Sequence, residues 1–295
     1  MPRILGTTAP DVHEHGPPGA ALPAVESVRK AVRHHWAFAR IGMYLLLASL
    51  PLLAISAHVF GVVSMNATGP LLIIPLAATL IVLCVFAPHP IDRIVGHGLG
   101  WGMFACLVYD VFRLDTVYLL GLWGDFIPKM GTWLHTGTDP RTGAIVGYLW
   151  RYLGDGGGIG IAFFLIALAL GLQHRSRRTV LLAFVAFAVF PVWSGLIGTV
   201  ALSPHGQDDM FPLTPTTITL SLIGHLIFGL VLGLGFLHVR GRLGRHWPWR
   251  PLLPVRSPAG AGQPPIEALP PACGECGAAA DARWSIREGR GDPER

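Results

Sequence analysis

The sequence predicts an all-α fold, a multi-pass bundle of about six transmembrane helices, on the basis of three observations. Charged residues make up 13% of the chain and apolar residues 52%, whereas a soluble domain carries about 25% charge. Long stretches contain no charge at all, which is typical of membrane spans. Lys and Arg gather at the two ends and in short loops beside apolar runs, where such residues set the orientation of a protein in a bilayer.

Six apolar runs account for these spans. A helix needs about 20 residues to cross the hydrocarbon core, and all six runs are about that long, the second only barely. Backbone amides cannot bond to lipid, so each run should be helical and in contact with the bilayer. The runs cover residues 41–65, 70–87, 94–120, 143–172, 180–203 and 216–239.

The two ends of the chain lack an apolar period. Residues 1–36 are polar and contain Pro17, Pro18 and several His, with a short helix expected at about 25–37. From Trp247 onward the chain is rich in Pro, Gly and Ala, a composition that cannot bury a core. We therefore expect a disordered segment over residues 1–36, a six-span domain over 37–245 and a disordered tail over 246–295.

The basic residues fall on one side of this six-span arrangement. The opposite connections are poorer in Lys and Arg, and the last of them holds Asp208 and Asp209 but no basic residue. The positive-inside rule then places both termini in the cytoplasm of a cell-membrane protein. Since the net charge of +5 serves orientation, nucleic acid is excluded as a partner. The basic residues on this side are Lys30, Arg33, Arg40, Arg93, Arg175, Arg177, Arg178, Arg240, Arg242 and Arg245.

The third run carries charges at membrane depth. Asp110 lies roughly 24 Å along a helix that starts near residue 94, and Arg113 follows three positions later on the same face. Charges in lipid are costly unless they are paired or wetted, so the pair is either structural or part of a ligand site. Gly98 and Gly102 predict close packing against another helix. Asp125, beyond the run, is expected to be an exposed loop carboxylate.

The fourth run is longer than one span needs and contains glycines at 154 and 156–158. Arg151 and Asp155 are four positions apart, a spacing that predicts an ion pair on a helix. Two interpretations remain open. In the first, residues 143–153 form an interfacial helix and the span starts near Gly156. In the second, the span is broken at the glycines, and the backbone groups freed there bind a ligand.

The sixth run carries small and polar residues at every fourth position. Residues four positions apart lie on the same face of a helix, so these residues form a stripe. His225 lies near the middle of the run and is either hydrogen-bonded across a helix interface or a ligand-binding group. Gly229 and Gly233 predict the close approach of a partner helix. The whole stripe is Thr217, Ser221, His225, Gly229 and Gly233.

A second set of polar residues lies in the outer loops and the outer part of the first run. His and Asp are ligands for zinc, iron or copper, so His58, His205, Asp208 and Asp209 are candidate metal ligands. No close His-x-x-x-His or Glu-x-x-His spacing accompanies them, and solvated loop residues are the alternative interpretation.

Three functions remain open at this point. The chain binds or transports a small molecule, ion or proton through a polar site on the extracytoplasmic side. Alternatively, it is a membrane-embedded enzyme with an outward-facing Asp/His site that is able to hold a metal, or a structural membrane subunit. The candidate ligand-binding residues are Asp110, Arg113, Arg151, Asp155 and His225.

Overall fold

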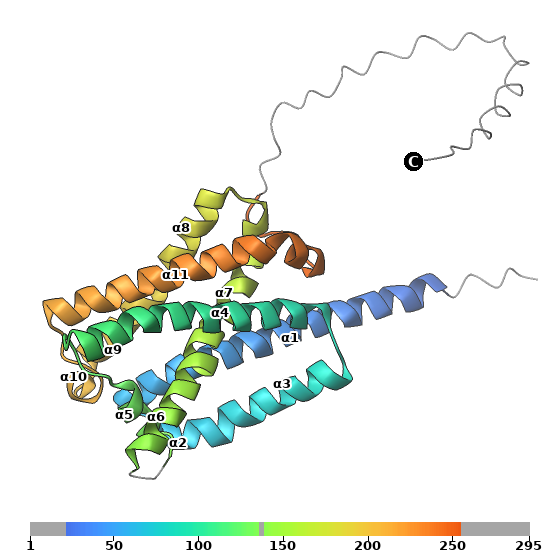
Figure 1. Cartoon of the computed structure of the whole chain (residues 1–295). Helices are drawn as coiled ribbons and strands as arrows, with labels where there is room; N and C mark the ends of the chain where they lie inside the picture. Colours follow the sequence, from blue (N-terminus) through green and yellow to red (C-terminus); the bar gives the residue numbers. More distant parts are fainter. Residues whose placement is uncertain (1–21, 136–138, 255–295) are drawn as a thin grey trace, which may run out of the picture. The chain divides into compact units, whose positions relative to one another are not determined.

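The computed structural model describes residues 22–135 and 139–254, with side chains from residue 35 onward. The described residues form helices and no strand, and six helices are long and apolar enough to cross a membrane. The predicted all-α, six-span fold class is therefore confirmed (Figure 1). The six are His35–Val59, Met65–Phe86, Pro90–Leu119, Pro140–Ala169, Arg177–Leu202 and Pro215–His246.

Several of these long helices contain a π-helical turn (η) between two α-helical parts. Large apolar side chains such as Leu71 and Phe86 are about 80% exposed on their outer faces, as contact with a bilayer requires. The elements are α1 (Leu22–Val59), α2 (Met65–Thr68), η1 (Gly69–Ile73), α3 (Ile74–Phe86), α4 (Pro90–Leu114), η2 (Asp115–Leu119), α5 (Ile127–Thr132), α6 (Pro140–Leu149), η3 (Trp150–Gly156), α7 (Gly157–Ala169), η4 (Leu172–His174), α8 (Arg177–Phe187), η5 (Ala188–Trp193), α9 (Ser194–Leu202), α10 (Gly206–Asp209), α11 (Pro215–Leu243) and η6 (Gly244–His246).

Described helices and contacts continue beyond both ends of the predicted six-span domain. Helix α1 begins at Leu22, so the short helix expected at 25–37 is continuous with the helix whose residues 35–59 form the first span. After α11, the backbone amide of Leu252 donates to the carbonyl of Ala169 at 2.8 Å, and Arg175 donates to the carbonyl of Pro254 at 2.7 Å. The folded part therefore extends beyond residue 245. Residues 1–21 and 255–295 of the predicted disordered ends lie outside the described residues.

Helix α4 packs closely against α7, as Gly98 and Gly102 predicted. A Cβ atom built on Gly160 of α7 would lie 2.7 Å from the Cα of Gly102 and in contact with the carbonyl oxygen of Gly98. Backbones approach this closely only where side chains are absent. The contact fixes α4 beside the polar half of the fourth span, which places Asp110 near Arg151.

The predicted partner helix for Gly229 and Gly233 belongs to the same chain. A Cβ atom on Gly229 would lie 2.8 Å from the Cβ of Ala188, and one on Gly233 would lie 3.1 Å from the Cβ of Phe184. Both glycines are buried under the fifth span. The predicted close approach of a helix at Gly229 and Gly233 is confirmed, and the sequence could not tell which helix it is, because periodicity identifies a packing face but not the helix that covers it.

Candidate functional site

A cavity of about 410 Å³ lies among α1, α4, η3, α7, α8, η5, α9 and α11. Its volume falls within the range of about 300–1,000 Å³ that is usual for small-molecule sites. Most of its wall is apolar, formed by side chains such as Leu52, Leu196 and Phe228. The ionisable side chains in the wall include Arg113, Arg151, Asp155 and His225.

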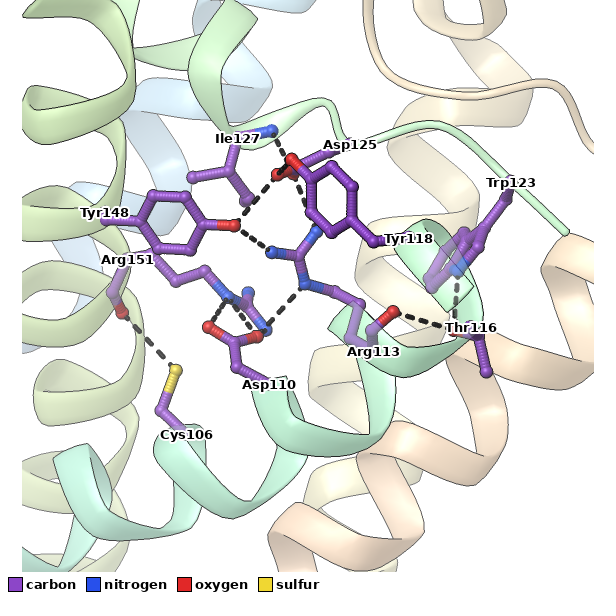
Figure 2. Close-up of polar contacts among 10 residues, drawn as sticks. All are labelled: Cys106, Asp110, Arg113, Thr116, Tyr118, Trp123, Asp125, Ile127, Tyr148 and Arg151. Carbon is purple, nitrogen blue, oxygen red and sulfur yellow. Dashed lines mark hydrogen bonds and ion pairs between the residues drawn. The ribbon is translucent and has the colours of Figure 1, made fainter. Parts of the chain in front are cut away.

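Asp110 forms ion pairs with two arginines at one end of this cavity (Figure 2). Arg113, one turn later on α4, donates from Nε to Asp110 Oδ1 at 3.1 Å. Arg151 of η3 donates from Nε to both carboxylate oxygens at 2.8 and 3.0 Å, and its Nη2 atom lies 2.7 Å from Oδ1. The predicted pair of Asp110 and Arg113 is confirmed, and it is part of a larger network.

Asp125 completes this network from the loop after the third span. It accepts from Arg113 Nη1 at 2.8 Å and from the hydroxyls of Tyr148 at 2.8 Å and Tyr118 at 3.0 Å. Arg113 Nη2 donates to the Tyr148 hydroxyl at 2.8 Å. The Asp125 side chain is only 7% exposed, so its assignment as an exposed loop carboxylate was wrong. The loop folds back over Arg113 because a second carboxylate is needed to neutralise the second buried arginine.

These contacts also set the protonation of Asp125. Burial raises the pKa of Asp125, but hydrogen bonds from Arg113, Tyr148 and Tyr118 outweigh it and hold this pKa below the ordinary value of 3.8. A carboxyl with a lowered folded-state pKa stabilises the fold above its unfolded pKa, and this stability is lost as the pH falls through the folded-state pKa.

We therefore expect the Asp125→Asn protein to be less stable than the wild type at pH 7 and to lose less of its stability on acidification below about pH 4. Melting temperatures in detergent between pH 3 and pH 7 measure both effects. The exposed Asp115, changed to Asn, is the matched control. Identical pH profiles of the wild type and Asp125→Asn would contradict the prediction.

Asp155 lies in the same cavity wall with one unpartnered carboxylate oxygen in the described part of the chain. Its side chain is buried, with the residue 8% exposed, and its Oδ1 atom has no hydrogen-bond partner among the described residues. The predicted ion pair with Arg151 was wrong, because Arg151 binds Asp110 instead. The two residues lie on η3, where π-helical bonding shifts positions 151 and 155 away from the alignment of an α-helix.

The glycines of the fourth span do not break the helix. It runs without interruption from Pro140 to Ala169 through η3, which rules out the interpretation of a broken span. Gly156 and Gly158 instead allow close packing, since added Cβ atoms would lie 2.6 Å from the Cβ of Cys106 and from the carbonyl oxygen of Ala48. An interfacial start of this helix stays a prediction.

His225 faces the cavity from α11. Its Nδ1 atom lies 2.7 Å from the carbonyl oxygen of Ser221, so Nδ1 carries the proton and the neutral ring leaves Nε2 as an acceptor. The ring also lies 5.4 Å from the ring of Tyr109, edge to face. This hydrogen bond lies within one helix and not across a helix interface, which was one of the two interpretations of His225.

The structure thus brings four of the five candidate ligand-binding residues to one cavity: Arg113, Arg151, Asp155 and His225. Asp110 is not part of the cavity wall but binds both arginines from behind it. Sequence reasoning missed Tyr148, although it precedes Arg151 by three positions and shares its helix face. It also missed the contribution of α1, where Ser56 carries no signal beyond being a small polar residue in an apolar run.

The candidate metal ligands do not converge. Among residues 35–135 and 139–254, no group of three or more His, Cys, Asp or Glu side chains is placed to hold a metal ion. His58 instead packs on Trp133, with ring centroids 4.7 Å apart, and Asp209 pairs with Lys129 at 3.3 Å. The geometry gives His58, His205, Asp208 and Asp209 no common role.

Comparisons of the chain with protein-family models, with curated proteins and with solved structures gave no match. The functional proposal therefore rests on the cavity and its polar side chains.

Proposed function

We propose that this chain is a multi-pass protein of the cell membrane that binds a small molecule in the cavity beside Asp155 and His225, as a binding or transport protein. The observation that carries the proposal is the unpartnered, buried Oδ1 atom of Asp155. Leaving a buried polar atom unpaired costs about 1–3 kcal/mol. Intramembrane ionisable groups that face a cavity are typical of ligand sites, and a bound molecule would supply the missing hydrogen bond.

The arginines support the same assignment. Arg113 and Arg151 are both neutralised by carboxylates, Asp125 and Asp110. Their positions are fixed by these contacts, so the polar end of the cavity is preorganised before any ligand arrives. Asp155 and His225 keep unused acceptor atoms, and Arg151 keeps an unused donor at Nη2; these are the groups that a ligand would meet.

The other two functions have less support. The outward Asp/His set of the enzyme hypothesis, His58, His205, Asp208 and Asp209, contributes no residue to the cavity wall. The structural-subunit hypothesis requires an exposed glycine face, whereas Gly229 and Gly233 are covered by the fifth span of the same chain.

The binding test uses the change Asp155→Leu, which removes both carboxylate oxygens at little change in size. In lipid nanodiscs, we expect the melting temperature of the wild type to rise with millimolar butanol or butylamine, relative to butyrate, because a ligand that binds the native state stabilises it. Asp155→Leu should melt higher without ligand, by about 1–3 kcal/mol in unfolding free energy, and should not respond to the ligands.

The exposed Asp115, changed to Leu, controls for effects of the solutes on the bilayer and should respond as the wild type does. An equal response of Asp155→Leu and wild type to all three solutes would contradict the proposal.

We further propose that both termini are cytoplasmic, which puts Asp110 and the cavity's polar end toward the extracytoplasmic side. Arg40 is fully buried and paired with Asp92 at 2.7 Å, so the orientation depends on the other basic residues of that side, such as Arg177 and Arg178. A fluorescent protein fused after Pro254 should fluoresce, and alkaline phosphatase fused there should be inactive. Active phosphatase at this position would contradict the six-span orientation.

A further inference from the structure

Residues of the first and fifth spans border one side of the cavity. These helices touch near their C-terminal ends, where the hydroxyls of Ser56 and Thr199 lie 3.0 Å apart and Ser203 donates to the carbonyl of Val59 at 2.5 Å. One turn earlier on each helix, Leu52 of α1 and Gly195 of α9 line the cavity. The two helices are therefore joined at one end and separated by the cavity further along.

Residues on both sides of this separation are exposed on the surface as well as lining the cavity. On α1, Leu53 lines the cavity and is 58% exposed. On the opposite side, Pro191 and Gly195 line the cavity and are exposed. A residue that meets both conditions marks an opening.

The surface around this opening is apolar. Phe190, next to Pro191, is 73% exposed. Only 17% of an apolar 18-residue stretch of the fifth span is buried within the protein. Pro191 lies inside the π-helical turn η5, because proline lacks an amide hydrogen and disturbs the regular α-helical pattern. An apolar opening on the lipid-facing side of a span leads into the bilayer and not into water.

The charge at the inner end of the cavity restricts the head group. Arg113 and Arg151 contribute two positive charges, and Asp110 and Asp125 contribute two negative charges, so this network is neutral. The remaining groups include two acceptors, the carboxyl of Asp155 and, in the neutral ring, Nε2 of His225. Nη2 of Arg151 lies 2.7 Å from Asp110 Oδ1 as an ion pair but donates no hydrogen bond among the described residues. Acceptors pair with donors, so a hydroxyl or amino head group fits, and a carboxylate or phosphate meets an unpaired carboxyl.

We propose that the cavity takes a single-chain amphiphile that arrives sideways from the bilayer between α1 and the fifth span. Its hydroxyl or amino head group donates a hydrogen bond to Asp155, with His225 Nε2 as a second acceptor, and its apolar tail leaves through the opening beside Leu53 and Gly195. This assignment rests on the proposed binding function and adds the ligand class and the route.

The test uses two glycines of α9 that differ in one respect. An added Cβ atom meets nothing within 4 Å at Gly195 or at Gly198, so both tolerate a side chain, but only Gly195 lines the cavity. Gly195→Leu should weaken the binding of tritiated dodecanol to the protein in phosphatidylcholine nanodiscs at least tenfold, and Gly198→Leu should change it less than twofold. Leu53→Trp, on the opposite side of the opening, provides an independent obstruction.

Competition by dodecanol, dodecylamine and dodecanoate tests the head group. Dodecanol and dodecylamine should displace the tritiated probe at concentrations at least tenfold lower than dodecanoate, and Asp155→Leu should remove this preference. Unchanged binding in both Gly195→Leu and Leu53→Trp, with weaker binding in Asp155→Leu, would overturn the lateral route and leave the proposed function intact. Binding of all three compounds that is insensitive to Asp155→Leu would overturn the proposed function itself, and preferred binding of dodecanoate would overturn the head-group assignment.

Discussion

Replacing Asp110 by Asn is expected to lower the free energy of unfolding by about 3–5 kcal/mol, the usual loss when one partner of a buried ion pair is removed. Asp110 is 1% exposed and is the carboxylate that binds both Arg113 and Arg151. Its removal leaves two buried guanidinium groups with only one carboxylate, Asp125. The melting temperature in detergent and the yield of folded protein measure the loss.

The ion pair of Asp110 with Arg151 determines how much stability a second change, Arg113→Gln, restores to Asp110→Asn. If Arg113 were the single partner, Asp110→Asn with Arg113→Gln would recover most of the stability. Because Arg151 also depends on Asp110, and Asp125 loses its own partner when Arg113 is changed, we expect the double variant to recover only a small part. The exposed Asp115→Asn, on the following turn, serves as the control. Wild-type stability of Asp110→Asn, or full recovery in the double variant, would contradict the network.

Replacing Gly160 by Val is expected to cost at least about 3 kcal/mol, the upper part of the range for overpacked cores. The atoms that its Cβ would meet belong to the backbone of α4, at Gly98 and Gly102. They can only give way if the two helices move apart. Such a separation would also move Asp110 away from Arg151, so we expect the cavity to lose its ligand response as well.

Gly100→Val is the matched control for this experiment. Gly100 lies on α4, the helix that Gly160 contacts, between Gly98 and Gly102. An added Cβ atom at Gly100 meets nothing within 4 Å. Exposed substitutions of this kind stay within about 0.5 kcal/mol. Thermal unfolding of both variants in the same detergent decides the comparison, and similar melting temperatures for Gly160→Val and Gly100→Val would show that the close contact of α4 and α7 does not hold the bundle together.

The six spans could be predicted because a helix that contacts lipid needs a long run of apolar residues, and such runs are visible in the sequence. The pair of Asp110 and Arg113 could also be predicted, since three residues along one helix fix its geometry. The pairing of Asp110 with Arg151 could not, because their relative position depends on how α4 packs against the fourth span. Asp125 was assigned to solvent for the same reason: a loop carboxylate is buried only by a tertiary contact that the local sequence does not encode.

Asp155 illustrates a different limit of sequence reasoning. Its spacing from Arg151 predicts an ion pair if the helix is α-helical throughout. This ion pair does not form because both residues lie in a π-helical turn, which no pattern in the sequence indicated. The cavity was equally out of reach, since its wall combines residues of eight separate helical elements and two loops. Helix faces can be read from the sequence, whereas the space that remains between packed helices depends on every crossing angle.

The π-helical turn η3 also bears on which residues of the fourth span meet the polar cluster. A π-helical turn amounts to one extra residue accommodated in an α-helix, and each residue of an α-helix rotates the chain by about 100°. Without that extra residue, α6 would be turned by about 100° relative to α7. Tyr148 would then face away from Asp125, while α7 would keep its glycine contact with α4. The one additional residue in η3 thus decides whether Tyr148 joins the polar cluster around Arg113.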